Sequence, residues 1–267
     1  SMTLFPYTTL FRSANYRVVA DEQVSMDIPE PVEVAIVPQN IPLQILYEDQ
    51  DILIVDKPKG MVVHPAPGHP DQTLVNAVMY HCKDSLSGIN GEIRPGIVHR
   101  IDQDTTGSLI ICKNDTAHIK IAEQIKVHSI RRIYRGIVIG RVSKEEGVIH
   151  APIGRNPNDR KKMAINEKNG KDAITHYRVL KRYKDYTYME FQLETGRTHQ
   201  IRVHMASIGH PLLGDMVYGP KKCPYKLQGH TLHAALIGFV HPTTGEYMEV
   251  EAPIPEYFSH LLTILPE

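Results

Sequence analysis

A carboxylate stands in a short loop whose surroundings suit it for chemistry. Residues 99–107 read His-Arg-Ile-Asp-Gln-Asp-Thr-Thr-Gly, with apolar runs at residues 97–98 and 109–111 on either side. Two such runs predict strands, and a loop held between strands is a common place for catalytic groups. An ionised Asp102 can act there as a nucleophile or as a base. The same residues also fit ordinary turn chemistry, since Asp and Thr bond nearby backbone and Gly accepts a positive φ.

A second segment places an arginine where a helix is expected to begin. Residues 194–205 read Glu-Thr-Gly-Arg-Thr-His-Gln-Ile-Arg-Val-His-Met. The spacing predicts a helix that Thr198 caps, with apolar side chains at positions 201, 205 and 208 turned inward and stop signals at positions 209 and 211. Arg202 would lie near the N-terminal end of that helix, where the helix dipole disfavours a cation. This misfit favours a paired, functional arginine.

Read together, the two segments resemble the paired signatures of the RluA/RluD-type pseudouridine synthases, because both motifs occur in the same order and at a plausible separation. The resemblance covers about residues 41–255. It implies an α+β fold, the pseudouridine synthase catalytic fold, with a central mixed, largely antiparallel sheet and a cleft across it. It also implies an isomerase that converts uridine to pseudouridine in RNA and needs no cofactor and no metal.

The resemblance assigns three catalytic residues. Asp102 matches the essential aspartate, Tyr134 the active-site tyrosine, and Arg202 the arginine that pairs with the aspartate. The reaction breaks the N1–C1′ bond, turns the uracil and joins C5 to C1′, and Asp102 could act at C1′, at C2′ or at uracil C6. Arg202 would keep Asp102 ionised through charge-assisted hydrogen bonds. Tyr134 offers a ring for stacking and a phenol that could assist removal of the C5 proton.

Substrate binding should draw on arginines, lysines and a histidine near these motifs. A base in a stacked helix is out of reach, so the target nucleotide must leave the stack, and phosphate contacts would offset that cost. Arg100 matches the arginine implicated in occupying the space of the flipped base. The predicted substrate-binding residues are Arg100, His99, Arg131, Arg132, Arg155, Arg160, Lys161, Lys162 and Arg197.

Composition narrows the class of protein. The 30 basic and 30 acidic residues balance, so a nucleic-acid site must be a local basic patch. The three cysteines are odd in number and lack metal-type spacing, which argues against a disulfide framework and a zinc site and fits a reducing cytoplasm. No apolar run approaches the roughly 20 residues of a membrane span, so a membrane partner is not expected. A monomer is the default expectation.

Local patterns predict several elements. Residues 52–55 form an apolar run that indicates a buried strand leading into a Lys-Pro-Lys-Gly turn. Helical spacing predicts an amphipathic helix over residues 73–82, and Asn114-Asp115 can cap another. Residues 187–193 alternate between apolar and polar or amphipathic side chains, as in a half-buried strand. Strand-rich segments with a few helices between them favour an α+β fold.

The chain divides into three parts by pattern. Residues 1–13 read as a non-native leader, and residues 14–40 resemble the remnant of an S4-like RNA-binding domain, with two short strands and a linker. Residues 41–267 behave as one pseudouridine synthase catalytic domain.

The family's nearest members suggest large-subunit ribosomal RNA as the favoured substrate and transfer RNA as the second. A non-catalytic RNA-binding or ribosome-assembly module is the main alternative, and a glycosylase-like hydrolase that releases the base is another. The presence of Asp102, Tyr134 and Arg202 speaks against a binding module. Other polar residues of the family-like segments are interpreted mainly as scaffold: Lys57, His199, His204, Asp215 and Tyr218.

Overall fold

The computed structural model describes residues 2–4, 20–21, 24–26, 36–66, 68–83, 85–89, 95–159 and 161–267. The chain forms two compact units, residues 1–35 and residues 36–267. In the first unit, β1 (Met2–Leu4) pairs in parallel with β2 (Val24–Met26). β2 lies within the second of the two short strands expected before the linker, and the first lies outside the described residues. The assignments of a leader and of an S4-like remnant stay predictions.

The second unit begins at Ile36, ahead of the predicted boundary at residue 41. The Asn76 side chain donates to the backbone oxygen of Val37 at 2.8 Å, and the Gln39 nitrogen donates to the backbone oxygen of Asn76 at 2.9 Å. These hydrogen bonds attach residues 36–40 to the first helix of the unit, so this part of the chain packs with the second unit.

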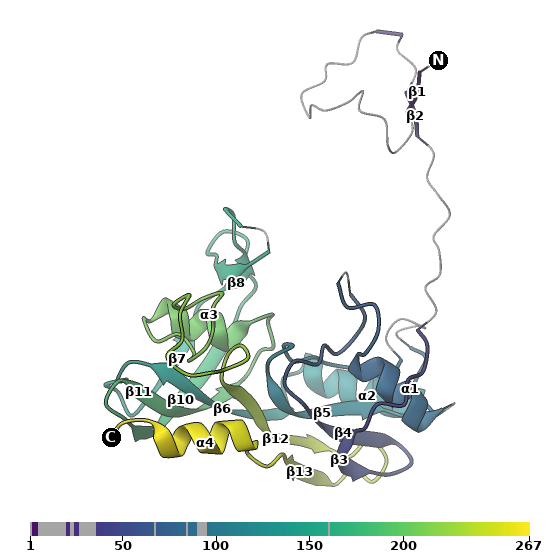
Figure 1. The fold of residues 1–267 in the computed structure, drawn as a ribbon. Coiled ribbons are helices and arrows are strands. Elements are labelled where there is room, and N and C mark those ends of the chain that lie inside the picture. Colours follow the sequence, from purple (N-terminus) through teal and green to yellow (C-terminus); the bar gives the residue numbers. More distant parts are fainter. Residues whose placement is uncertain are drawn as a thin grey trace. The chain divides into compact units, whose positions relative to one another are not determined.

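One large sheet organises the second unit (Figure 1). Its strands follow the order β3 (Gln44–Glu48), β4 (Ile52–Lys57), β5 (Thr106–Cys112), β12 (Leu232–Val240), β6 (Arg131–Ile139), β11 (Tyr186–Leu193), β10 (Ile174–Arg182) and β7 (Glu146–His150), and β13 (Tyr247–Glu251) also pairs with β12. Among these described strands β5 and β12 run parallel, and the other neighbours are antiparallel. The predicted mixed, largely antiparallel sheet is confirmed.

Two of the predicted helices are present, and each begins after a capping side chain. α1 (Leu74–Cys82) follows a capping box in which the Thr73 hydroxyl and the Asn76 side chain each accept a backbone N–H of the other residue. α2 (Asp115–Lys126) follows Asn114, whose side chain accepts the Ala117 N–H at 2.9 Å. Alternate residues of β4 pack against different helices. Leu53 and Val55 lie in the hydrophobic cluster that includes α1 residues, whereas Ile52 and Ile54 lie in the cluster that includes α2 residues.

The other two helices cover opposite faces of the half of the sheet that contains β6 (Figure 1). α3 (Gln200–Ser207) buries Ile201 and Met205 in one cluster with Val138. α4 (Glu256–Ile264) buries Phe258 against Ile137, the neighbouring residue of β6. A separate hairpin of β8 (Ile153–Arg155) and β9 (Met163–Ile165) stands outside the large sheet. Among the described residues, none of the helices has the length and apolar content needed to cross a bilayer.

The Asp102 loop is held differently from the prediction. Residues 97–98 do not form a strand, and Ile97 makes one bridge, to Ile111. Gly107 lies inside β5 rather than in the turn, with a φ of +112°. A Cβ there would lie 2.2 Å from the Ala234 backbone oxygen of β12. Gly107 is therefore required by the close approach of the two parallel strands as well as by its backbone conformation.

The start of α3 also differs from the prediction. The N-cap is His199, in the left-handed conformation with φ 57° and ψ 24°, and not Thr198. The Gln200 side-chain oxygen accepts the Thr195 hydroxyl at 2.8 Å and the Arg197 N–H at 3.0 Å, which closes the turn without a threonine cap. Ile208 follows the last helical residue and is 41% exposed. The prediction that Ile208 faces the core is therefore wrong.

Candidate active site

Asp102 lies where two cavities of the second unit adjoin. One cavity, of about 480 Å³, is lined by Tyr134 and Arg132 of β6 among others, and the second, of about 390 Å³, is lined by Val62 and His230 among others. Asp102 lines both. The cleft expected across the sheet thus has the loop carboxylate in its wall.

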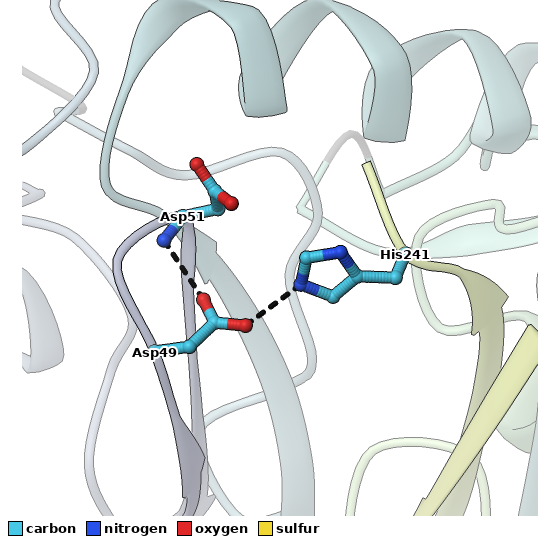
Figure 2. Close-up of side chains that lie close together, drawn as sticks. All are labelled: Asp49, Asp51 and His241. Atoms are coloured by element: carbon cyan, nitrogen blue, oxygen red, sulfur yellow. Dashed lines mark hydrogen bonds and ion pairs between the residues drawn. The ribbon is translucent and has the colours of Figure 1, made fainter. Parts of the chain in front are cut away.

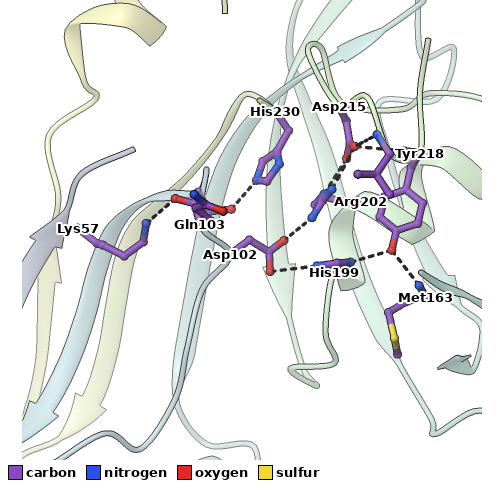
Figure 3. Close-up of polar contacts among 11 residues, drawn as sticks. Lys57, Asp102, Gln103, Met163, His199, Arg202, Asp215, Tyr218 and His230 are labelled. Atoms are coloured by element: carbon purple, nitrogen blue, oxygen red, sulfur yellow. Dashed lines mark hydrogen bonds and ion pairs between the residues drawn. The ribbon is translucent and has the colours of Figure 1, made fainter. Parts of the chain in front are cut away.

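Arg202 of α3 connects Asp102 to a second carboxylate (Figure 3). Its Nη1 donates to Asp102 Oδ2 at 3.0 Å, while Nε and Nη2 donate to the Asp215 oxygens at 2.7 and 3.1 Å. The side chains of Arg202 and Asp215 are 7% and 1% exposed, and that of Asp102 is 17% exposed. The pairing of Asp102 with Arg202 that the resemblance implied is therefore present as a buried, charge-assisted contact.

This environment favours an ionised Asp102. Burial raises the pKa of the Asp102 carboxyl, but the neighbouring His199 side chain and the charge and hydrogen bond of Arg202 outweigh burial and hold that pKa below its ordinary value. Oδ2 is occupied by Arg202, and Oδ1 lies 3.8 Å from His199 Nε2, beyond hydrogen-bond distance. One oxygen is thus oriented by the protein while the other is left for a reacting group.

Tyr134 occupies the middle of β6, where it is flanked by Phe191 on β11 and Ala234 on β12. It is 8% exposed and lines the larger cavity. Burial raises the pKa of the Tyr134 phenol, and the Asp102 charge raises it further against the opposing effect of Arg132. The phenol consequently keeps its proton at neutral pH, beside an ionised carboxylate.

Arg132 is a buried cation in the wall of the same cavity. Its Nη2 donates to the Glu194 backbone oxygen at 3.0 Å, and its buried Nε has no hydrogen-bond partner among the described residues. Burial lowers the pKa of its guanidinium. A Cβ on Gly196 would lie 2.6 Å from Arg132 Nη1, so the glycine leaves room for this arginine. Arg132 thus brings positive charge to the wall of the cavity.

The remaining predicted binding residues fall into separate groups. His99, Arg100 and Arg197 line the larger cavity with Arg132, and His99 Nε2 also accepts the Ile110 N–H at 3.0 Å. The hairpin of β8 and β9 carries Arg155, Lys161 and Lys162. Arg131 is not among the residues that line either cavity and instead pairs with Glu249 at 2.7 Å. Arg160 lies outside the described residues.

Three residues interpreted mainly as scaffold lie at the site. Asp215 binds Arg202, and His199 lies between Asp102 and Tyr218, whose hydroxyl is 2.7 Å from His199 Nδ1 (Figure 3). The available signal was the family-like stretch that contains Asp215 and Tyr218, but contacts across such distances in the chain are not visible in a sequence.

Lys57 supports the loop from behind. Its fully buried ammonium donates to the backbone oxygens of Pro58 at 3.0 Å, Met61 at 2.7 Å and Gln103 at 2.8 Å. Burial lowers the pKa of Lys57 to about 7. The Gln103 contact fixes the backbone next to Asp102, so Lys57 stays a structural residue, as interpreted from the sequence.

A second polar cluster joins Asp49, Asp51 and His241 (Figure 2). His241 Nδ1 accepts the N–H groups of Thr243 and Thr244, which leaves the ring proton on Nε2, and Nε2 donates to Asp49 Oδ2 at 2.7 Å. Both oxygens of each aspartate also accept hydrogen bonds from neighbouring groups. These ligand atoms are already engaged, so the cluster is a structural tie between two turns and not a cation site.

Comparison with known proteins places these features in context. Residues 51–207 match the family model described as RNA pseudouridylate synthase. A Bacillus subtilis protein named uncharacterized RNA pseudouridine synthase YlyB is 53% identical over 249 residues, which span 93% of this chain and 81% of that protein. The ribosomal large subunit pseudouridine synthase D of Zymomonas mobilis is 48% identical over 264 residues, 96% of this chain and 83% of that protein.

Among solved structures, human RNA pseudouridylate synthase domain containing 1 matches with a TM-score of 0.66 and 24% identity, over 89% of this chain and 99% of that chain. This likeness shows a shared fold. It agrees with the sheet and helices described above.

Proposed function

The chain belongs to the RNA pseudouridylate synthase family, whose members isomerise uridine to pseudouridine in RNA, and on this premise we propose that Asp102 is the essential carboxylate of that reaction. The observation that carries the proposal is the buried contact of Asp102 with Arg202 at the junction of two cavities. A carboxylate kept ionised in a partly buried position is suited to attack a sugar carbon, to remove a proton, or to add to a pyrimidine ring.

The neighbours of Asp102 have complementary roles in this proposal. Arg202 orients Oδ2 and leaves Oδ1 toward the reacting atoms. Tyr134 presents a ring on which uracil can stack and a protonated phenol. Arg132 supplies positive charge in the wall of the cavity that the extruded nucleotide would enter, and Arg100, which is exposed and lines both cavities, occupies the space that the base leaves in the RNA.

The proposed substrate is large-subunit ribosomal RNA, with transfer RNA as the alternative. Relatives from Zymomonas mobilis and Pseudomonas aeruginosa, 48% and 47% identical, are named ribosomal large subunit pseudouridine synthase D. The basic residues of the β8–β9 hairpin, Arg155, Lys161 and Lys162, offer phosphate contacts outside the cavities. We propose that the protein works as a monomer in the cytoplasm and requires neither metal nor cofactor.

The test maps pseudouridine by carbodiimide-adduct primer stops in unmodified large-subunit ribosomal RNA and in bulk transfer RNA. Wild-type protein is compared with Asp102→Asn and with Asp104→Asn, which removes the other carboxylate of the same loop. We expect new stops in ribosomal RNA that vanish with Asp102→Asn and persist with Asp104→Asn. Stops that survive in Asp102→Asn would refute the assigned role. Release of free uracil would instead indicate a hydrolase, and binding without stops a non-catalytic module.

A further inference from the structure

A chain of polar contacts runs from the β8–β9 hairpin to Asp102 (Figure 3). The Met163 N–H of β9 donates to the Tyr218 hydroxyl oxygen at 3.0 Å, and that oxygen lies 2.7 Å from His199 Nδ1. On the other side of the ring, His199 Nε2 faces Asp102 Oδ1 at 3.8 Å. The imidazole therefore stands between the carboxylate and a backbone group of the hairpin.

A consistent set of protons follows when the Tyr218 oxygen accepts the Met163 N–H and its own proton is donated to His199 Nδ1. A neutral imidazole with Nδ1 as acceptor carries its proton on Nε2, the nitrogen that faces Asp102. Burial lowers the pKa of His199, which favours this neutral form.

The position of the ring is determined from several sides. His199 adopts a left-handed backbone conformation, which side chains other than Asn and Asp seldom adopt, and it is the N-cap of α3. Its ring meets that of Tyr218 edge-on at 5.6 Å, and the Arg202 guanidinium lies 5.0 Å from the same Tyr218 ring. Tyr218 thus contacts two of the groups that face the Asp102 carboxylate, His199 and Arg202.

We propose that His199 is a positioning residue that holds Asp102 Oδ1 in its reactive orientation through Nε2–H, with Tyr218 and the Met163 backbone keeping the imidazole in place. This inference rests on the proposed role of Asp102. Arg202 orients one carboxylate oxygen, and the His199 N–H dipole on the other side opposes rotation of the group about its Cβ–Cγ bond. Because this series of contacts begins on β9, placement of the hairpin and orientation of the carboxylate depend on one set of polar contacts.

Two substitutions of His199 distinguish the effect of its side-chain donor from the effect of its backbone conformation. The amide nitrogen of His199→Gln reaches the position of Nε2 and keeps a donor toward Asp102, whereas His199→Asn places its amide near the position of Nδ1. Asparagine accepts the left-handed conformation better than glutamine, so backbone preference alone would make the Asn variant the more active of the two. We expect Gln to keep most of the kcat and Asn to lose roughly tenfold to a hundredfold, the scale of a catalytic group misplaced by about 1 Å, with RNA affinity unchanged in both. An Asn variant as active as the Gln variant would overturn the proposal.

Tyr218→Phe provides the second test because it removes the hydroxyl and keeps the ring beside Arg202. Its loss of kcat should not add to that of His199→Asn in the double variant, since both break the same chain. If the losses of kcat in the double variant were additive, Tyr218 and His199 would not act through the same series of contacts.

A readout that needs no turnover separates this inference from the proposed function. Nitrogen-detected imidazole NMR spectra of the wild-type protein should show His199 with its proton on Nε2, and Tyr218→Phe should yield a mixture of tautomers. If the wild-type protein instead carried the His199 proton on Nδ1, the proposed role of His199 would be refuted even in an active enzyme. The expected tautomer in a protein that forms no pseudouridine would instead count against the assigned function alone.

Discussion

Arg202 meets Asp215 through two hydrogen bonds, Nε to Oδ2 at 2.7 Å and Nη2 to Oδ1 at 3.1 Å, and this contact decides which nitrogen is left for Asp102. Asp215 is held in turn by the N–H groups of Val217 and Tyr218, at 3.0 and 3.1 Å. The guanidinium therefore cannot rotate freely, and Nη1 faces the Asp102 loop. Two carboxylates share one arginine, so the buried group keeps a net negative charge.

Replacing Asp215 should affect stability and turnover together. Asp215→Ala leaves Arg202 buried without its bidentate partner, and we expect the free energy of unfolding to fall by about 3 to 5 kcal/mol, with a lower kcat because Arg202 Nη1 is no longer oriented. Asp215→Asn keeps the shape and should lose less. Urea unfolding and single-turnover rates on RNA measure the two effects.

The matched control is Glu249→Ala, which breaks the exposed ion pair with Arg131 and should change the free energy of unfolding by no more than about 1 kcal/mol. Full turnover in a folded Asp215→Ala protein would show that Arg202 needs no such anchor.

The lysines of the β8–β9 hairpin should act on RNA binding and not on chemistry. Lys161 is exposed, and Lys162 contacts Asp159 at 3.6 Å. Replacing both by alanine should reduce the slope of log K against log salt by roughly 1 to 2, about 0.7 per lost phosphate contact on a single strand. The kcat at saturating RNA should stay near that of the wild type.

Filter-binding titrations from low to moderate salt measure that slope. Lys144→Ala, an exposed lysine between β6 and β7, is the control for a general loss of positive charge. An unchanged slope in the double variant would exclude the hairpin from the RNA interface.

Acid should weaken the tie around Asp49. Burial raises the pKa of this carboxyl, but hydrogen bonds from the Ile52 N–H, the Tyr47 hydroxyl and His241 outweigh burial and bring it to about 2, below the ordinary value of 3.8. Because the folded-state pKa is the lower one, the stabilisation is complete above pH 4 and is lost as the pH falls toward 2.

Urea unfolding between pH 6 and pH 2 should show this loss, at most about 2 kcal/mol after solvent screening. Asp49→Asn should flatten that part of the profile. An identical pH profile in the variant would mean that other carboxyls account for the acid sensitivity.

Local patterns in the sequence predicted those helices and strands that are determined by interactions between residues close in the chain. Asn114 caps α2, residues 74–82 form α1, and alternate residues of β11 are buried, because capping and side-chain alternation act within a few residues. The start of α3 was predicted wrongly because the turn before it is closed by the Gln200 side chain, which accepts the Thr195 hydroxyl and the Arg197 N–H, and the helix begins after His199. Residues 97–98 failed to form a strand even though their pattern favoured one.

The amino-acid sequence alone was sufficient for the family and for its three candidate catalytic residues, since the motifs around Asp102 and Arg202 are local strings. Only the tertiary structure could pair Asp102 with Arg202, because they are 100 positions apart and the packing of the fold brings the Asp102 loop against α3. The same packing buried Arg132 in the cavity, left Arg131 outside it, and set His199 between Asp102 and Tyr218. Adjacent residues on a strand point to opposite faces, so two neighbouring arginines reach different surroundings once the sheet has formed.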